Sequence, residues 1–448
     1  MLSNGQVIEL ALESLACEGD AVGHHDGQAV FVPYGAPGDR AAVAVTDAHR
    51  TYCRAEIRRI IEPSPERVAP GCPLFGACGG CQWQMLSYRA QLEQKRTILR
   101  DSLQRIGGFA PPEIDAVPDD SGWGYRNKAQ FPVAGDAGRL ALGYYRRGTH
   151  HIIPVDQCPI AAGPINAAWP ALREALQGSG LPGYNEARQR GVLRHVTLRA
   201  SRRTGALTVV LVTAGQQHLG ELAARIMAGV PGVDAVWQNV NPGRGNAIYG
   251  ARWHHWAGAR HTTETIAGLE FRLSPSAFLQ VNLPQAERAY RLMADALRPR
   301  RGDAVLDLYC GAGAIALGLA PLVRSVVGIE DSPHAVADAA ASAERNGIAN
   351  CEFISGAAER AAAAVAAADL VVLDPPRKGA DPALWPELRR LAPRAVAYLS
   401  CNPATLGRDA RLLSAIGYRL ERAWMVDLFP QTHHVESLCI FGREKEEG

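Results

Sequence analysis

The fold is decided by the stretch from Ala304 to Ala314, which reads Ala-Val-Leu-Asp-Leu-Tyr-Cys-Gly-Ala-Gly-Ala. Its first five residues are mostly apolar and predict a buried strand. Gly311 and Gly313 then predict a turn into a helix, where the missing side chains let a ligand approach the backbone closely. Open α/β sheets bind their ligands at the carboxyl ends of the strands. The stretch therefore predicts a Rossmann-like sheet with a ligand site at this turn.

A second strand, Val326 to Glu330, also ends in a carboxylate. A carboxylate at this position can accept hydrogen bonds from both ribose hydroxyls of a nucleoside cofactor. Both NAD and S-adenosylmethionine carry such a ribose. The third glycine of a dinucleotide pattern is missing, and Asp307 ends the first strand, so we favour S-adenosylmethionine and keep NAD as the alternative. The residues expected to contact the cofactor on this basis are Asp307, Gly311, Gly313 and Glu330.

The chain has 448 residues, which predicts about three domains. Residues 1–62 alternate apolar and polar positions between glycines and prolines, a pattern typical of a small OB-like β-barrel. Residues 63–264 predict a central α+β domain. In residues 265–448 strands alternate with helices, which predicts βαβ units around a parallel sheet. The predicted fold class is therefore α/β, with the Rossmann-like domain last.

Several segments carry clear local signals. Cys53 to Ile61 predicts a strand with basic residues along it, which fits either an RNA-binding face or a solvated edge. The polar stretch from Tyr88 to Ile106 predicts a helix. Leu193 to Ala200 and Ala206 to Thr213 alternate around a polar turn and predict a hairpin. Ala357 to Ala368 is rich in alanine and predicts a helix.

Composition limits the possible functions. Hydrophobic residues make up 47% of the chain and the formal net charge is +2, so any nucleic-acid surface must be a local basic patch. The first residues lack a basic and then apolar leader, and no run is apolar enough to span a membrane. We therefore expect a soluble cytoplasmic protein. The ten cysteines are unevenly spaced, which favours metal or catalytic roles over disulfides.

The motif Asp374-Pro375-Pro376-Arg377 follows another apolar strand. In nucleic-acid methyltransferases this position faces the methyl donor and the target base. Adenine-N6 enzymes place an aromatic residue after the prolines, whereas this chain has Arg377. Cytosine-5 enzymes place a cysteine after a proline here, whereas this chain has Pro376. The motif therefore excludes both of these substrate classes.

Cys401, in Ser400-Cys401-Asn402-Pro403, provides what methylation of a pyrimidine at C5 requires. C5 of uracil is a poor nucleophile until a thiolate adds at C6, and a base must afterwards remove the C5 proton. Glu436 is the predicted base. The alternatives are a buried structural thiol for Cys401 and an ion-paired surface carboxylate for Glu436. His434 is given no catalytic role.

Cysteines also gather near the start of the central region. Cys72, Cys78 and Cys81 lie close together, and Cys158 can supply a fourth thiolate. Such a set suits structural zinc or an iron-sulfur cluster, and spacing alone slightly favours zinc. Basic and aromatic residues in Tyr125 to Lys128 and in Leu142 to Arg147 can bind phosphate and stack on bases, or can lie on solvated strand faces.

At these residues the chain resembles the TrmA/RumA class of RNA uracil-5-methyltransferases, over nearly its whole length. The resemblance is carried by these motifs: Phe278-Leu279-Gln280-Val281-Asn282, the glycine turn, Asp374-Pro375-Pro376-Arg377, Ser400-Cys401-Asn402-Pro403 and His434-Val435-Glu436. It implies that Cys401 is the nucleophile and Glu436 the base. It also implies that the methyl donor is surrounded by Gln280, Tyr309, Glu330 and Asp374.

The same resemblance implies that the N-terminal barrel is a TRAM domain, an RNA-binding module. Because a subgroup of the family carries a 4Fe-4S cluster on such a cysteine pattern, it favours that cluster on Cys72, Cys78, Cys81 and Cys158, with structural zinc as the alternative. The chain departs from the family at two positions: Ala314 stands where some members carry a polar residue after the glycine turn, and Ala357 stands where an adenine-contacting Asp or Asn is usual.

The resulting hypothesis is S-adenosylmethionine-dependent methylation of C5 of a uridine in structured RNA. The iron-sulfur subgroup favours 23S ribosomal RNA, and transfer RNA at a uridine-54 type position is the alternative. No membrane and no obligate protein partner are expected. A different class of function, a catalytically inert RNA-binding iron-sulfur protein, is disfavoured because a decayed enzyme is expected to have lost Cys401 or Glu436.

Overall fold

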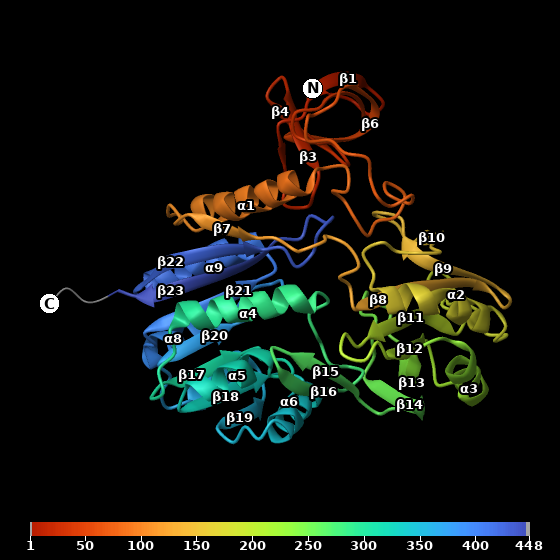
Figure 1. Cartoon of the computed structure of the whole chain (residues 1–448). Coiled ribbons are helices and arrows are strands. Elements are labelled where there is room, and N and C mark those ends of the chain that lie inside the picture. The colour runs from red at the N-terminus through yellow and green to blue at the C-terminus, as the bar shows by residue number, and fades with distance from the viewer. Residues whose placement is uncertain (1, 445–448) are drawn as a thin grey trace. The chain divides into compact units, whose positions relative to one another are not determined.

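The computed structural model describes residues 2–444, which form two compact units (Figure 1). The first unit comprises Met1–Gly76, Gly80–Gly122 and Val372–Gly448. The second comprises Ala77–Gly79 and Trp123–Val371. The division into 1–62, 63–264 and 265–448 stays a prediction, and Met1 and residues 445–448 lie outside the described residues.

The first unit begins with a six-stranded sheet in the order β1-β5-β6-β4-β3-β2. Its strands are β1 (Val7–Ala11), β2 (Ser14–Leu15), β3 (Ala21–His25), β4 (Gln28–Val32), β5 (Arg40–Ala48) and β6 (Tyr52–Glu62). The alternating burial of β1 shows that one face of the sheet is packed and the other is solvated. The pairing of β5 with β6 shifts register three times, and such bulges bend a sheet. The strand expected from Cys53 to Ile61 is confirmed by β6, whereas OB-type closure stays a prediction.

The second unit contains a seven-stranded sheet in the order β10-β9-β8-β11-β12-β13-β14. Its elements are β8 (Lys128–Asp136), β9 (Arg139–Tyr145), β10 (Ile152–Pro154), α2 (Gly163–Gln177), β11 (Leu193–Ala200), β12 (Leu207–Thr213), α3 (Gly220–Gly229), β13 (Val233–Val240) and β14 (Arg252–Gly258). Strands β11 and β12 pair antiparallel, which confirms the predicted hairpin.

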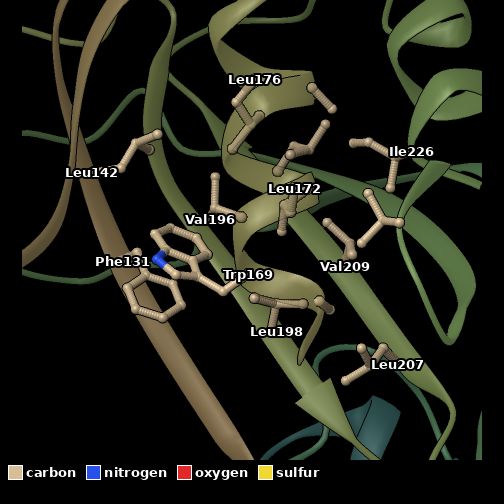
Figure 2. Close-up of a cluster of buried hydrophobic side chains, with 14 of the residues drawn as sticks. Phe131, Leu142, Trp169, Leu172, Leu176, Val196, Leu198, Leu207, Val209 and Ile226 are labelled. Atoms are coloured by element: carbon tan, nitrogen blue, oxygen red, sulfur yellow. The ribbon is translucent and has the colours of Figure 1, made fainter. Parts of the chain in front are cut away.

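Helix α2 packs on this sheet through one buried stripe that includes Trp169 and Leu172 (Figure 2). The Trp169 ring stacks on Phe131 of β8, with ring centroids 3.8 Å apart and an interplanar angle of 19°. Its Nε1 donates a hydrogen bond of 2.6 Å to the carbonyl oxygen of Val155. The large aromatic pair therefore contributes buried apolar area without leaving the indole N–H unpaired.

The second unit continues with βαβ units, as the sequence predicts. Their elements are β15 (Thr262–Ile266), β16 (Leu269–Leu273), α4 (Leu283–Leu297), β17 (Ala304–Leu308), α5 (Ala314–Leu319), β18 (Ser325–Glu330), α6 (Pro333–Arg345), β19 (Cys351–Ser355) and α7 (Ala358–Ala361). Strands β17, β18 and β19 pair in parallel. The predicted helix from Ala357 to Ala368 is wrong for most of its length, because only α7 and a short 3₁₀ turn, Ala362–Ala364, form there.

The eight-stranded sheet has the order β19-β18-β17-β20-β21-β23-β22-β7, and the chain passes from the second unit to the first within β20 (Leu370–Leu373). The remaining elements of the first unit are α1 (Tyr88–Arg105), β7 (Ile114–Val117), α8 (Leu384–Leu391), β21 (Ala395–Ser400), α9 (Pro403–Ala415), β22 (Tyr418–Val426) and β23 (Glu436–Arg443). Helix α1 confirms the helix predicted from Tyr88.

Two early segments complete this part of the first unit. Strand β7, orange in Figure 1, pairs in parallel with β22, which is blue. Helix α1 lies against α9, where a Cβ on Gly407 would come within 2.6 Å of the Ser102 carbonyl oxygen. Only glycine allows this close approach. Within residues 2–444, no helix is both long enough and apolar enough to cross a membrane.

Candidate active site

Cys401 lies in the turn between β21 and α9. Asn402 caps the helix, because its Oδ1 accepts from the Ala404 N–H at 3.1 Å, and Pro403 occupies the first turn. The Asn402 Nδ2 donates to the Arg377 carbonyl oxygen at 3.0 Å. The Asn402 N–H is bound by the Ser400 Oγ at 3.1 Å. The thiol is therefore presented by a turn whose flanking residues are both fixed.

Glu436 is placed by strand register. Strands β21 and β23 are antiparallel, and Ser400 pairs with Ser437. Because the residues following one strand oppose those preceding the other, Cys401 and Glu436 occupy the next position of this pairing. The Ser437 Oγ also donates to the Ser400 carbonyl oxygen at 3.3 Å. The sheet thus brings together two predicted catalytic residues that are 35 positions apart in the sequence.

Asp374 and Arg377 complete the group from the loop after β20. The Arg377 carbonyl oxygen accepts from Asn402, as above, and also from the Thr405 Oγ1 at 3.3 Å. Its Nη2 lies 3.2 Å from the His434 Nδ1, so the geometry makes that nitrogen the acceptor. His434 therefore contacts the Arg377 guanidinium and can orient it, and the absence of a catalytic role for His434 stays a prediction.

Burial raises the pKa of all three acidic groups, and nearby charges add to this effect at Cys401 and Glu436. Burial raises the pKa of the Cys401 thiol to about 11, and the charges of Glu436 and Asp374 add to the effect while Arg377 opposes it. Burial, helped by Asp374, raises the pKa of Glu436 to about 8. Burial alone raises the pKa of Asp374 to about 7. In the free protein at neutral pH, Cys401 is a thiol and Glu436 is mostly protonated. A carboxyl whose pKa lies near the working pH is a stronger base than an ordinary glutamate.

The loop that leads into Glu436 is held by helix α1. Lys95 and Asp427 form an ion pair of 2.6 Å in which both side chains are fully buried. The Lys95 Nζ also donates to the Phe429 carbonyl oxygen at 2.9 Å, and the Tyr88 hydroxyl donates to the Asp427 Oδ2 at 2.9 Å. The loop from Asp427 to Phe429 is thereby tied to one face of α1.

A second contact holds the next part of the same loop. Gln91 of α1 accepts from the Gln431 N–H at 2.9 Å and donates to its side-chain oxygen at 3.0 Å. The Gln431 carbonyl oxygen in turn accepts from the Trp83 N–H at 3.1 Å, and the Trp83 Nε1 donates to the Gly19 carbonyl oxygen at 3.0 Å. The loop is thus linked through Trp83 to the N-terminal sheet.

In the second unit, the glycine turn follows β17 as predicted. Gly311 and Gly313 have φ values of 55° and 82°, in the left-handed region that favours glycine. A Cβ on Gly313 would lie 3.0 Å from the Ala339 Cβ. The Asp307 side chain is buried, and its Oδ2 accepts from the Ala316 N–H at 3.0 Å. Asp307 therefore fixes helix α5 behind the turn.

Glu330 ends β18 beside the same turn. Its Oε2 accepts from the Gly311 N–H at 3.1 Å, and its Oε1 accepts from the Ser332 N–H at 2.9 Å. Both oxygens keep a further lone pair, as accepting two ribose hydroxyls requires. Tyr309 has a φ of 63°, which is rare for a residue with a side chain and is found at ligand sites. The structure thus gathers Asp307, Tyr309, the glycines and Glu330 at one turn.

Two further positions bear on the cofactor. The Gln280 carbonyl oxygen accepts from the Asn127 Nδ2 at 3.0 Å, so the segment before α4 is fixed to the strand β8 region. Ala357 is the residue before α7 and makes no side-chain cap. The structure therefore offers no polar side chain at Ala357, where the sequence resemblance predicts a contact to adenine.

The predicted cysteine ligands are divided between the units: Cys72 and Cys81 belong to the first, Cys78 and Cys158 to the second. The backbones of Cys78 and Arg146 form an isolated antiparallel β-bridge. Burial raises the pKa of the Tyr144 hydroxyl, and Cys158 and Cys78 add to this effect. Burial raises the pKa of the Cys158 thiol, and the backbone N–H groups of Ile160 and Ala161 oppose this effect in part by bonding to its sulfur.

Thiolates suit a metal ion or an iron-sulfur cluster by their chemistry. No group of three or more His, Cys, Asp or Glu residues in the described part of the chain is close enough to hold a metal ion. The four-cysteine cluster accordingly stays a prediction.

The sequence did not point to Lys95 or Asp427, because nothing in a polar helix signals contact with a loop 332 residues away. The sequence does carry a signal for Arg377 beside Cys401, because this residue directly follows the double proline. By itself, that position only excludes other substrate classes.

A family model described as tRNA (Uracil-5-)-methyltransferase matches residues 265–444, and a TRAM domain model matches residues 2–57. An uncharacterised RNA methyltransferase of Halalkalibacterium halodurans is 38% identical over 446 residues, covering 98% of this chain and 97% of that protein. Another from Nostoc sp. is 39% identical, covering 96% and 95%.

A solved structure matches over almost the same length. It is Pyrococcus abyssi tRNA (uracil-54, C5)-methyltransferase in complex with S-adenosyl-L-homocysteine, with 28% identity and a TM-score of 0.78. The match covers 97% of this chain and 99% of that chain.

Proposed function

Because the chain belongs to the family of S-adenosylmethionine-dependent RNA (uracil-5-)-methyltransferases, we propose that it methylates C5 of one uridine through a covalent adduct with Cys401. The observation that carries the proposal is the strand register that sets Cys401 opposite Glu436. A thiol and a carboxyl side by side are what addition at C6 and later removal of the C5 proton require.

Cys401, Arg377 and Glu436 have separate roles in the proposed reaction. The Cys401 thiol and the Glu436 carboxyl each lose a proton to solvent water, and the Arg377 charge stabilises the Cys401 thiolate. The thiolate sulfur forms a bond to C6 of uracil, and the electron pair moves to C5. There it takes the electrophilic methyl group that S-adenosylmethionine would supply when bound, and S-adenosyl-L-homocysteine would leave. The Glu436 carboxylate then removes the C5 proton, and the electrons re-form the C5–C6 double bond as the sulfur leaves as a thiolate.

The methyl donor is proposed to bind at the glycine turn of the second unit, with Gln280, Asp307, Tyr309, Gly311, Gly313, Glu330 and Asp374 as its contacts. Support comes from the left-handed glycines and from the two free lone pairs of Glu330. The adenine is proposed to be held by backbone groups, since Ala357 cannot supply a polar side chain.

The substrate is proposed to be large-subunit ribosomal RNA, acted on in the cytoplasm, with the TRAM domain as an RNA-binding module. Transfer RNA is the second candidate, favoured by the tRNA (uracil-54, C5)-methyltransferase of Pyrococcus abyssi. A target uridine must leave its base stack to reach Cys401, and this unstacking costs roughly a few kcal/mol. An unpaired loop is therefore the expected context.

The test is methyl transfer from labelled S-adenosylmethionine to RNA from a strain that lacks the gene, with digestion to nucleosides. We expect 5-methyluridine in the RNA with the wild-type chain and none with Cys401→Ala. Separation of ribosomal and transfer RNA before counting decides the substrate. Equal incorporation of labelled methyl groups by both proteins would contradict the covalent mechanism.

A 4Fe-4S cluster on Cys72, Cys78, Cys81 and Cys158 is proposed as a structural group, with zinc as the alternative. Its support is the cysteine order and the backbone amides that face the Cys158 sulfur. Protein purified without oxygen is expected to contain iron and acid-labile sulfide. Stoichiometric zinc in their place would assign the site to zinc, and a lack of all three would overturn it.

A further inference from the structure

A cavity of about 390 Å³ opens in the second unit. Its aromatic and polar lining comes from β9, from β11 and from the loops that follow β9 and precede β11: Tyr145, His150, Tyr184, Glu186, Arg194 and His195. This volume is within the range of ligand pockets and holds one nucleobase with its ribose. None of these residues belongs to the catalytic group, the glycine turn or the cysteine set.

Arg194 is the central charged group of the cavity. It is 6% exposed, and its Nη1 donates to the carbonyl oxygens of Asn241 and Gly243. Its guanidinium carbon lies 4.8 Å from the centre of the Tyr184 ring. The Nε is buried without a hydrogen-bond partner, and Arg194 makes no ion pair with any described residue. A buried cation in this state favours a ligand that brings electron-rich acceptor atoms.

The other groups supply complementary contacts. The His195 Nδ1 is also buried without a partner, and burial together with the Arg194 charge lowers the pKa of His195 to about 4. His195 is thus a neutral ring that can donate and accept at pH 7. Glu186 accepts a hydrogen bond from His150, and the ring of His150 stacks on Tyr145 with centroids 5.2 Å apart.

Strand β9 explains why Tyr145 faces the cavity. Successive side chains of a strand point to opposite faces, so Tyr144 and Tyr145 diverge. Tyr144 packs against the core and lies beside Cys158. Burial raises the pKa of the Tyr145 hydroxyl, and the charge of Glu186 adds to this effect while that of Arg194 opposes it. Glu186 and Arg194 both line the cavity. An aromatic ring, a guanidinium and a carboxylate therefore line one space.

We propose that this cavity binds one unpaired nucleobase of the RNA substrate, a nucleotide other than the target uridine. The inference rests on the proposed function, because it takes the substrate to be RNA. The base stacks on Tyr145, Arg194 donates to its ring nitrogen or carbonyl acceptors, and Glu186 accepts from its amino group. Unpaired bases are commonly read in this way, by stacking and by hydrogen bonds to their edges. Such a contact strengthens RNA binding without touching the reacting atoms.

The first measurement is ultraviolet crosslinking of the wild-type full chain to RNA from the gene-deletion strain, followed by nuclease and protease digestion and mass spectrometry. A nucleotide adduct on the peptide that holds Tyr145 or Tyr184 is expected. The second measurement is steady-state methyl transfer by Tyr145→Leu and Arg194→Lys, with Arg225→Met as the control. Arg225 is an exposed arginine of the same unit that also donates to a backbone carbonyl oxygen, that of Gly178.

Loss of one stacked base predicts that KM for RNA rises about ten-fold or more in Tyr145→Leu. The kcat and the affinity for S-adenosylmethionine are expected to stay at wild-type values, as does every constant of Arg225→Met. Arg194→Lys keeps the charge and loses the fork, so its KM is expected to rise as well.

Crosslinks confined to other peptides, with an unchanged KM in Tyr145→Leu, would overturn the inference. Crosslinking needs no turnover, so it tests RNA binding in the cavity independently of the methylation reaction. A crosslinked Tyr145 peptide without any methyl transfer by the wild-type chain would refute the proposed reaction and leave the RNA contact standing.

Discussion

Replacing Lys95 by methionine removes the cation of the buried pair that ties helix α1 to the loop before Glu436. Lys95 and Asp427 are both fully buried and 2.6 Å apart, and the change leaves the Asp427 carboxylate with the Tyr88 hydroxyl as its remaining donor among these contacts. Breaking a buried pair by removing one partner costs about 3–5 kcal/mol, because the other charge stays buried. We expect a loss of that size in the free energy of unfolding.

Urea unfolding followed by tryptophan fluorescence measures this loss, and Trp83 lies 5.9 Å from the Lys95 Nζ. Arg105→Met is the matched control on the same helix, because its partner Asp101 is 3.3 Å away and the pair is exposed. An exposed pair contributes about 0–1 kcal/mol. The double variant Lys95→Met/Asp427→Asn removes the stranded charge and is expected to recover about 1–3 kcal/mol. A loss in Lys95→Met no larger than that of the control would refute this reasoning.

Alkylation of Cys401 by iodoacetamide is expected to accelerate as pH rises toward about 11. At a fixed pH above about 8, where Glu436 is ionised, alkylation is expected to be faster in Glu436→Gln, since a charge that raises the thiol pKa is gone. Peptide mass spectrometry measures it, and a rate independent of pH contradicts it. The folded-state pKa of Glu436, about 8, lies above its ordinary value of 4.5, so the wild type loses stability as pH rises through that window while Glu436→Gln does not. Urea midpoints at pH 4, 6 and 9 are expected to diverge in favour of the variant, and parallel curves would speak against the shift. Gly313→Ala forces a side chain into a left-handed conformation at about 1–2 kcal/mol and is expected to weaken binding of S-adenosyl-L-homocysteine in calorimetry. Gly318→Ala, inside α5 with open space around it, is the control, and equal affinities would exclude this role of the turn.

Local sequence signals predicted those parts of the protein that depend on neighbours in the chain. The apolar residues from Ala304 to Leu308 predict a strand, and the conformational freedom of the glycines that follow predicts a turn. The structure has both. Cys401 and Glu436 could be named because their chemistry is specific, although their adjacency depends on the pairing of β21 with β23. That pairing has no local signature.

Two features lay beyond sequence reasoning for physical reasons. The stretch from Ala357 to Ala368 has high helix propensity, but alanine side chains bury little area, so most of the stretch does not form a helix. The contact between Lys95 and Asp427 joins segments 332 residues apart. Lysine in a polar helix is usually solvated, and only the packed structure shows this one buried.

The most direct test of the central claim is the fate of RNA bound to Glu436→Gln in the presence of S-adenosylmethionine. Without the base, the C5 proton stays on the methylated uracil and the sulfur cannot leave. A protein–RNA adduct that survives a denaturing gel is expected, with the nucleotide on the Cys401 peptide, and no adduct with Cys401→Ala/Glu436→Gln. Ready turnover by Glu436→Gln, or an adduct that persists without Cys401, would contradict the account.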